Sequence, residues 1–443
     1  MQSIAALTLS AQGSLHAPSR HIPVSLPPFF MYTRRMRKYR QTAALRLLLS
    51  VLLLLSLLAP PVALCAPAGR MPEEPEPDMP TEMPGYSTEN LRQLTELVQR
   101  TGVGSDKIPA LNRPDFLSIS DASLSMDNDE VVFVVHYPRN LVRIYPQRIL
   151  VWHEVVNDVI PDAEGKLPPR YVPGMPEAEG ERYTISYSPL TGSVVGFRSM
   201  VSRYPSSFGL SGNLLNGNSV LYDRISRSLW SQLLAVCIEG PFRGKRLDRI
   251  RVLQARWKGV KERYGGLHTE FNGKAEVLSR STGFKRTYGK DPYGSYQTTG
   301  NYYDNTVVPF PVSHLDPRLP PKKRILGIER DGAFGAVQKD VVRQERLLNF
   351  TLGLTPMVGV YDRELDAVRI FERRLDGRDL SFIIFEDKIV DEQTRSEWAP
   401  TGSCVYGPLR EKKLEPVLAV DSMWFAWASF YRNTRIFPFN DWQ

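Results

Sequence analysis

The feature that most constrains this chain's fold is a long internal repetition, which resumes at Trp398 the pattern that begins at Trp230. Four pairs keep a spacing of 167 residues: Gly240 and Gly407, Leu247 and Leu414, Trp257 and Trp424, Tyr264 and Tyr431. Further upstream, Tyr187 and Phe197 align with Tyr361 and Phe371 at a spacing of 174, and Val156-Asn157 aligns with Leu348-Asn349 at 192. This shared order predicts a duplicated unit, and its period is too long for a solenoid.

Short runs of β-branched and aromatic residues dominate both copies. Val131–Val135, Tyr183–Tyr187 and Ser193–Val201 are typical of strands, and asparagines between residues 213 and 218 indicate turns. Helical patterns are fewer and lie at Ser87–Arg100, Pro146–Val156 and Trp257–Tyr264. The sequence therefore predicts an α+β fold that is dominated by β-strands, with two similar β-rich lobes and few short helices.

Composition divides the chain into five segments. We expect residues 1–68 to be a signal peptide, in which an over-called start is one reading of the first 30 residues, and residues 69–86 to be a flexible linker rich in Pro and Glu. Residues 87–271 form the N-terminal lobe, which is the first copy. Residues 272–324 are a Tyr- and Gly-rich connecting segment that we expect to wrap over the body, and residues 325–443 form the C-terminal lobe.

The N-terminal segment predicts export. A basic cluster at Met36–Arg40 precedes an apolar run from Leu47 to Leu58, and Ala66-Pro67-Ala68 offers small residues for cleavage. The run is shorter than the roughly 20 residues that span a bilayer. We therefore expect a periplasmic or extracellular protein, whose only membrane contact would be an uncleaved signal.

The positive charge of the chain resides mainly in this leader. Seven of its residues are Lys or Arg and none is Asp or Glu, so removing it reduces the formal charge from +8 to +1. The mature chain lacks the basic excess that nucleic-acid binding requires, although Lys285, Arg286 and Lys290 lie among tyrosines. We expect no nucleic-acid partner.

Several motifs in this order resemble the bacterial and archaeal domain-of-unknown-function family 3179. The matching pieces are Tyr145-Pro146, Ile149–Asp158, Tyr187–Ser193, Leu221–Arg224, Leu229-Trp230, Gly240-Pro241, Asp291–Tyr293, Phe310–Val312 and Trp424–Trp427. The resemblance implies an exported protein and supplies no mechanism. Family members often have a cysteine after the tyrosine, where this chain has Ser188, so thiol chemistry or metal binding is in doubt here.

His153 and its neighbours are candidates for a site because the second copy lacks them. On a helix, His153 and Asn157 lie one turn apart, as do Glu154 and Asp158. A general base needs such a carboxylate near its imidazole. A structural role and a small-ligand site are the alternatives. Asn157 stands where a zinc-protease helix would have its second histidine, and we expect no metal.

Ser188 and Asn213 complete the candidate set. Ser188 follows a predicted strand and becomes a nucleophile if a base approaches it, but turn chemistry also explains it. The polar stretch Ser211–Asn218 is present in one copy only. Its amides could bind a ligand or build a hairpin.

Cys237 and Cys404 are equivalent in the repeat, each three residues before Gly-Pro. Near a pseudo-two-fold axis they could form a disulfide, and away from it they are small buried residues.

The leading interpretation is an exported ligand-binding or scaffolding module with a polar cleft, in the first copy or between the copies. A small polar ligand is the expected partner, and the sequence identifies no cofactor. The alternatives are a hydrolase with His153 as general base, and an envelope structural protein without a small-molecule site.

Overall fold

The computed structural model describes residues 88–162, 164, 166, 181–266, 271–294, 301–303 and 306–438, except for the side chains of residues 88–90. These residues belong to one compact unit. Strands dominate them and the helices are few and short, which confirms the predicted β-dominated fold with few short helices. The predicted signal peptide and linker lie outside the described residues, and no described helix is long and apolar enough to span a membrane.

Among the described residues, the first half contains three sheets of five strands, whose orders are β1-β11-β12-β13-β14, β15-β8-β7-β6-β2 and β16-β4-β5-β17-β3. Its elements are α3 (Thr88–Glu96), β1 (Gln99–Arg100), β2 (Leu111–Asn112), β3 (Phe116–Ser118), α4 (Ile119–Ser123), β4 (Val131–Tyr137), β5 (Leu141–Pro146), α5 (Gln147–His153), β6 (Val155–Ile160), β7 (Glu181–Ser188), β8 (Ser193–Arg198), β9 (Met200–Val201), β10 (Tyr204–Pro205), β11 (Phe208–Leu215), β12 (Asn218–Asp223), β13 (Leu229–Ser231), β14 (Val236–Glu239), β15 (Arg249–Ile250), β16 (Leu253–Arg256), α6 (Trp257–Gly265) and β17 (Lys274–Leu278).

The second half has smaller sheets, with the orders β29-β18-β19-β30, β20-β21-β22 and β25-β26-β27-β28, and a β23-β24 hairpin. Its elements are β18 (Arg324–Arg330), β19 (Ala333–Gln338), α7 (Lys339–Glu345), β20 (Leu347–Leu352), β21 (Thr355–Asp362), β22 (Ala367–Glu372), β23 (Arg374–Leu375), β24 (Arg378–Asp379), β25 (Phe382–Phe385), β26 (Lys388–Asp391), β27 (Glu397–Trp398), β28 (Cys404–Tyr406), β29 (Ala419–Met423), α8 (Trp424–Phe430) and β30 (Arg435–Phe437).

The same local contacts recur in both halves. Asp223 accepts a hydrogen bond from the Trp230 indole at 3.0 Å, and Asp391 accepts one from Trp398 at 3.0 Å. In each half an antiparallel hairpin precedes a short helix: β4-β5 leads into α5, and β18-β19 into α7. A later strand then pairs antiparallel with the first hairpin strand: β16 pairs with β4, and β29 with β18.

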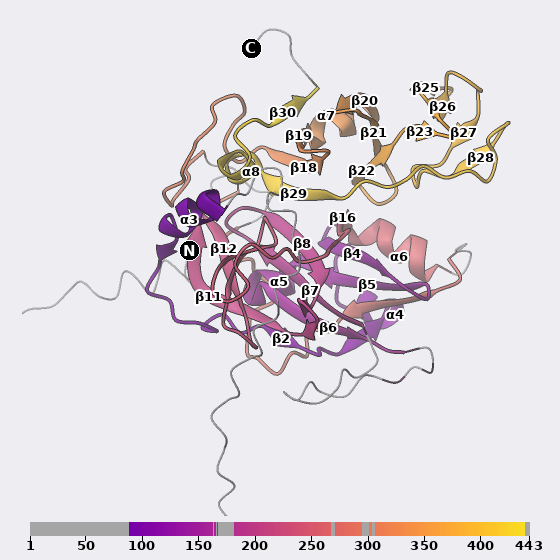
Figure 1. Ribbon diagram of the computed structural model, residues 1–443. Helices are drawn as coiled ribbons and strands as arrows, with labels where there is room; N and C mark the ends of the chain where they lie inside the picture. Colours follow the sequence, from indigo (N-terminus) through magenta and orange to yellow (C-terminus); the bar gives the residue numbers. More distant parts are fainter. Residues whose placement is uncertain are drawn as a thin grey trace, which may run out of the picture. The chain divides into compact units, whose positions relative to one another are not determined.

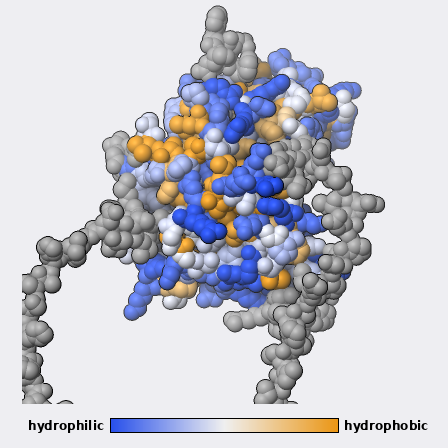
Figure 2. All heavy atoms as spheres, turned by 60° about the vertical axis from the view of Figure 1, so that its left-hand side comes forward, coloured by the Kyte–Doolittle hydropathy of each residue, from blue (hydrophilic) through white to orange (hydrophobic). Residues whose placement is uncertain are grey.

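Contacts between the halves run along two pairs of strands. β29 lies beside β8, and β16 lies beside β22 (Figure 1). One buried hydrophobic cluster draws on both halves and includes Trp230, Trp424 and Trp427. On the face in Figure 2, hydrophobic residues gather in a band between hydrophilic ones.

The residues between the lobes contribute to the first half's core. Tyr288, Tyr293, Tyr302 and Tyr303 are buried in a cluster with first-half residues. β17, which begins inside the expected connecting segment, pairs with both β5 and β3. Tyrosine suits this position because its ring packs in the core while its hydroxyl finds a polar partner.

The predicted helix at Pro146–Val156 is wrong at its C-terminal end. α5 stops at His153, and Glu154 adopts the left-handed conformation with φ of 57°, while its N–H still donates to the Leu150 carbonyl. A left-handed residue ends a helix because the next residue cannot continue the turn. The β-branched pair that follows enters β6, so Asn157 and Asp158 lie on a strand and not one helical turn from their partners.

Candidate functional site

Glu154 and Asn213 line one small cavity, and Ser188 lies behind Ser219, which also lines it. Ser219 donates to Glu154 Oε2 at 2.9 Å, and its hydroxyl lies 3.1 Å from that of Ser188. Glu154, Ser219 and Asn213 line the cavity, whose volume is about 20 Å³. That volume holds about one water molecule, so the cavity admits no substrate.

Glu154 is the carboxyl of this small cavity, and its pKa is shifted. Burial raises its pKa to about 7, although the hydrogen bond from Ser219 lowers it. A buried carboxyl without a neighbouring cation is easier to hold neutral than charged. Glu154 therefore changes charge near neutral pH, in a place that is closed to ligands.

His153 faces away from this cavity. Its imidazole is fully buried, and it makes two hydrogen bonds: Nδ1 to the Pro109 carbonyl at 2.8 Å and Nε2 to the Tyr288 hydroxyl at 2.7 Å. Burial lowers the pKa of His153. With both ring nitrogens satisfied, the side chain has the features of a core histidine that anchors the 279–294 segment.

Asn157 and Asp158 belong to two other networks, because neighbours on a strand point to opposite faces. Asn157 bonds to both backbone groups of Phe208, donating to the carbonyl at 2.8 Å and accepting from the N–H at 2.9 Å. Asp158 accepts from Arg143 and, at 2.6 Å, from the Tyr145 hydroxyl. Burial raises the pKa of Asp158, whereas the charge of Arg143 lowers it.

The turn predicted at Asn213 is wrong, because Asn213 lies within β11 and pairs with Arg100. The turn occupies Asn216-Gly217, both with positive φ. A register shift between Leu210 and Leu214 explains the extra polar residues of the stretch.

The disulfide considered for Cys237 and Cys404 is not formed, and both thiols are free and buried. Cys237 lies on β14 and Cys404 on β28, in different sheets. Each thiol donates to a carbonyl two residues on, that of Glu239 or of Tyr406. Burial raises the pKa of Cys237 to about 12 and also raises that of Cys404. These are unreactive core thiols.

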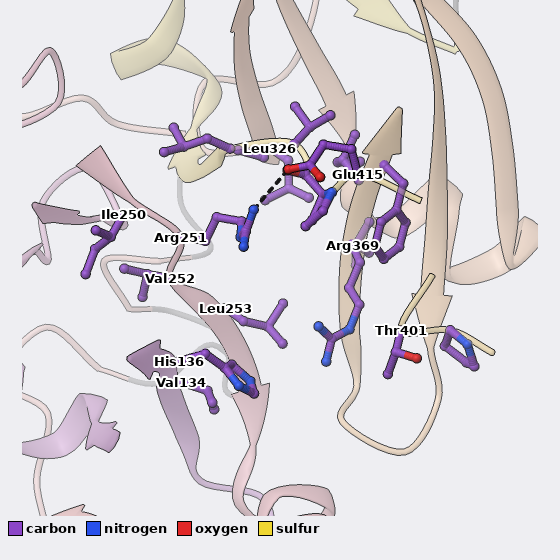
Figure 3. Close-up of a pocket in the computed structure, with 18 of the residues that line it drawn as sticks. Val134, His136, Ile250, Arg251, Val252, Leu253, Leu326, Arg369, Thr401 and Glu415 are labelled. Carbon is purple, nitrogen blue, oxygen red and sulfur yellow. Dashed lines mark hydrogen bonds between the residues drawn. The ribbon is translucent and has the colours of Figure 1, made fainter. Parts of the chain in front are cut away.

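A much larger cavity, of about 1710 Å³, lies between the halves (Figure 3). β4, β16 and α6 form one wall and β22 with residues 413–421 forms the other. This volume exceeds that of ordinary ligand pockets, which is roughly 300–1,000 Å³. It is large enough for a metabolite or for a short peptide.

Three arginines surround His136 in this cavity. Arg369 extends from β22 toward the first-half wall, and Arg251 donates to the Pro416 carbonyl at 3.0 Å across the cavity (Figure 3). Arg263 forms an ion pair with the buried Asp362, which Arg369 also contacts at 3.2 Å. The guanidinium groups therefore come from both halves.

His136 lines the same cavity as these arginines. Its Nε2 lies 3.0 Å from the Tyr264 hydroxyl. Enclosure by the cavity walls and the charges of Arg369, Arg251 and Arg263 lower the pKa of His136 to about 4. The imidazole is therefore neutral at physiological pH and leaves the arginines as the cationic groups.

Sequence reasoning missed this cavity because its residues come from strands far apart in the chain. Arg251 and Arg369 carry no local motif, and only the pairing of the halves brings them together. Tyr264 does stand out as the repeat partner of Tyr431, but that signal indicates structure and not a site. Among the described residues, no group of three or more His, Cys, Asp or Glu could hold a metal ion.

Comparison with known proteins gives the chain a family. No curated protein and no solved structure matches it. The family model described as "Protein of unknown function (DUF3179)" matches residues 105–167 and 176–434, most of the chain, as the resemblance in its motifs predicts. The chain therefore belongs to this family.

Proposed function

We propose that this protein is an exported binding protein that takes a small anionic ligand in the cavity between its halves. The observation that carries the proposal is the wall formed by His136, Arg251 and Arg369 in a space of about 1710 Å³. Binding sites often lie where two structural units meet, since side chains from both can converge there. This location agrees with a cleft between two repeat copies.

The charge of the wall favours an anion. Three guanidinium groups lie near His136, and the carboxylates that pair with them are Asp362 and Glu364. Arg251 donates to a backbone carbonyl, and no ion pair joins it to a carboxylate within the described ranges, although Glu415 lines the same cavity. Arginine binds carboxylates and phosphates through paired N–H donors, so a carboxylate- or phosphate-bearing ligand fits this wall.

We further infer that the two halves arose by duplication of one β-rich unit. Asn157 bridges the Phe208 backbone as Asn349 bridges that of Phe382. The parallel pairing of β17 with β5 also recurs as that of β30 with β19. Such matched pairings in one order support common descent, and they make the cavity the junction between the copies.

The N-terminal segment supports export. Its basic cluster, apolar run and small residues before position 69 have the order of a secretory signal. Cleavage there would release a chain with a formal charge of +1, which suits a binding protein of the periplasm or the cell exterior.

The enzyme alternative is less favoured by the geometry. A hydrolase with His153 as base would need a free ring nitrogen and a space for substrate, but both nitrogens are hydrogen-bonded. The cavity at Glu154 and Ser219 is too small for more than one water. The third alternative, an envelope structural protein, does not explain why arginines from both halves line one cavity.

Thermal unfolding of the mature protein tests the proposal, with inorganic phosphate, citrate and glucose as probes. A ligand at a hundred times its Kd stabilises the native state by about 2.7 kcal/mol. We expect phosphate or citrate, but not glucose, to raise Tm and to raise the pKa of His136, followed by its NMR signals. Arg251→Gln should reduce both effects, and Arg374→Gln on the β23-β24 hairpin is the matched control. If neither anion acts, or if the two variants respond alike, the proposal is refuted.

A further inference from the structure

The sheet β25-β26-β27-β28 presents a surface whose counterpart in the first half is covered. Phe382 on β25 corresponds to Phe208 on β11, because each ring packs edge-on against a tryptophan, Trp398 or Trp230. Each phenylalanine also pairs across its hairpin with the aspartate that holds that tryptophan, Asp391 or Asp223. The two hairpins can therefore be compared residue by residue from these pairs as far as Leu210–Leu221 and Ile384–Ile389.

In the first half, residues 88–108 cover this sheet. β1 pairs antiparallel with β11, and the Asp106 N–H donates to the Leu210 carbonyl at 3.0 Å. The segment passes so close that a Cβ on Gly212 would lie 1.9 Å from the Val103 carbonyl oxygen. Val103 and Ile108 line what remains beneath it, the 20 Å³ cavity beside Glu154.

α3 seals the other edge of the same sheet. Thr95 donates to the Ile238 carbonyl on β14 at 2.8 Å, and Ile238 has no exposed surface. Its counterpart in the second half, at the 167-residue spacing, is Val405 on β28, which is 53% exposed. An apolar residue that is covered in one half is bare in the other.

A pocket of about 180 Å³ lies beside the exposed Val405. It is lined by apolar residues of the sheet, including Ile384, Trp398 and Val405, and by Arg346 and Asp387 at its rim. Arg346 stands where Glu154 stands in the first half: both follow the short helix with positive φ, and each carbonyl accepts from a tyrosine N–H at 2.9 Å. The pocket is thus the open counterpart of the closed 20 Å³ cavity.

The edge of β25 is open in part. In the described part of the chain, β26 is the one strand that pairs with β25, whereas β11 has both β12 and β1 as partners. Asn349 bonds to the N–H and the carbonyl of Phe382, so the open part of this edge lies toward Ile384. An unpaired edge beside an apolar pocket is the arrangement that binds extended peptides, with backbone bonds for affinity and the pocket for specificity.

We propose that this surface binds an extended segment of a partner polypeptide, which bonds to the Ile384 backbone on β25 as Asp106 bonds to that of Leu210 on β11. The segment inserts one apolar side chain over Trp398 and Val405. It carries an acidic residue, since Arg346 and Arg363 share the single carboxylate of Asp387 at the rim. This inference rests on the matched contacts of the two sheets and not on the cavity between the halves.

The test uses a fluorescent synthetic peptide of residues 88–108, the sequence that covers the equivalent sheet, titrated into the mature protein by anisotropy. We expect saturable binding, which Val405→Asp weakens at least tenfold. Leu354→Asp is the matched control, because Leu354 is 84% exposed at the far end of the β20-β21 hairpin. A peptide with Asp at positions 103 and 108 should not bind.

Hydrogen exchange locates the bound peptide. Protection of 382–406 supports the proposal. No binding at millimolar peptide overturns it, and so does protection confined to β11, which would mean that the peptide displaces the chain's own segment. Light scattering tests whether a second copy of this chain covers the face instead. A dimer that Val405→Asp dissociates would show that it does, and would overturn the proposal of a partner segment.

Discussion

Replacing Glu154 with glutamine should change how stability depends on pH. Glu154 is buried, and its pKa in the folded chain is about 7, against an ordinary value of 4.5. Between these values the folded state holds a proton that the unfolded state has released. Stability from this group is therefore complete below pH 4.5 and is lost as pH rises through 7.

The shift from 4.5 to about 7 corresponds to about 3 kcal/mol, most of which falls between pH 5 and pH 8. The glutamine of the Glu154→Gln variant carries no charge at any pH, and its carbonyl can still accept from Ser219. The free energy of unfolding of the wild type, minus that of Glu154→Gln, should thus fall by about this amount over the range.

Urea unfolding at a series of pH values measures this difference, because the linear extrapolation gives a free energy at each pH. Glu392→Gln, at an exposed position, is the matched control for the loss of one carboxylate. If the Glu154→Gln difference is flat, or if it rises with pH, then Glu154 is not held neutral by burial and the reasoning fails.

Two further predictions concern matched residues of the halves. Trp230→Phe and Trp398→Phe each remove an indole N–H from a buried aspartate, so each should cost about 1–3 kcal/mol in urea unfolding, and a loss in one half alone would contradict the equivalence of the two contacts. Cys237 and Cys404 should react with a thiol reagent only after denaturation, and rapid reaction of the native protein would contradict their burial.

Much of the fold could be predicted from the periodicity of apolar residues and from the residues that mark turns. Val131–Val135 and Tyr183–Tyr187 lie in β4 and β7, and the predicted helix at Trp257–Tyr264 is α6. The end of α5 could not be predicted, because no glycine marks it. Glu154 is a good helix former, but it takes the left-handed conformation there because the residues that follow pair as β6 with β7.

The candidate site was predicted less well than the fold, for a related reason. The prediction assumed that His153 and Asn157 share one helix. In the structure α5 ends at His153 and β6 begins at Val155, so the two side chains are separated. The cavity between the halves depends on Arg251 and Arg369, whose proximity comes from sheet packing and leaves no pattern in the sequence.

The comparison between the halves also changes how a polar residue that occurs in one half only should be interpreted. Glu154 and Arg346 occupy the same backbone position, with φ of 57° and 69°. Glu154 lies beneath residues 101–108, where a carboxyl can be neutral and hydrogen-bonded, while Arg346 faces the open pocket and pairs with Asp387. The difference between them follows from what covers each sheet, since a buried charge without a partner is costly and an exposed one is not. A polar residue that is found in one half only is therefore first evidence that the two sheets are covered differently.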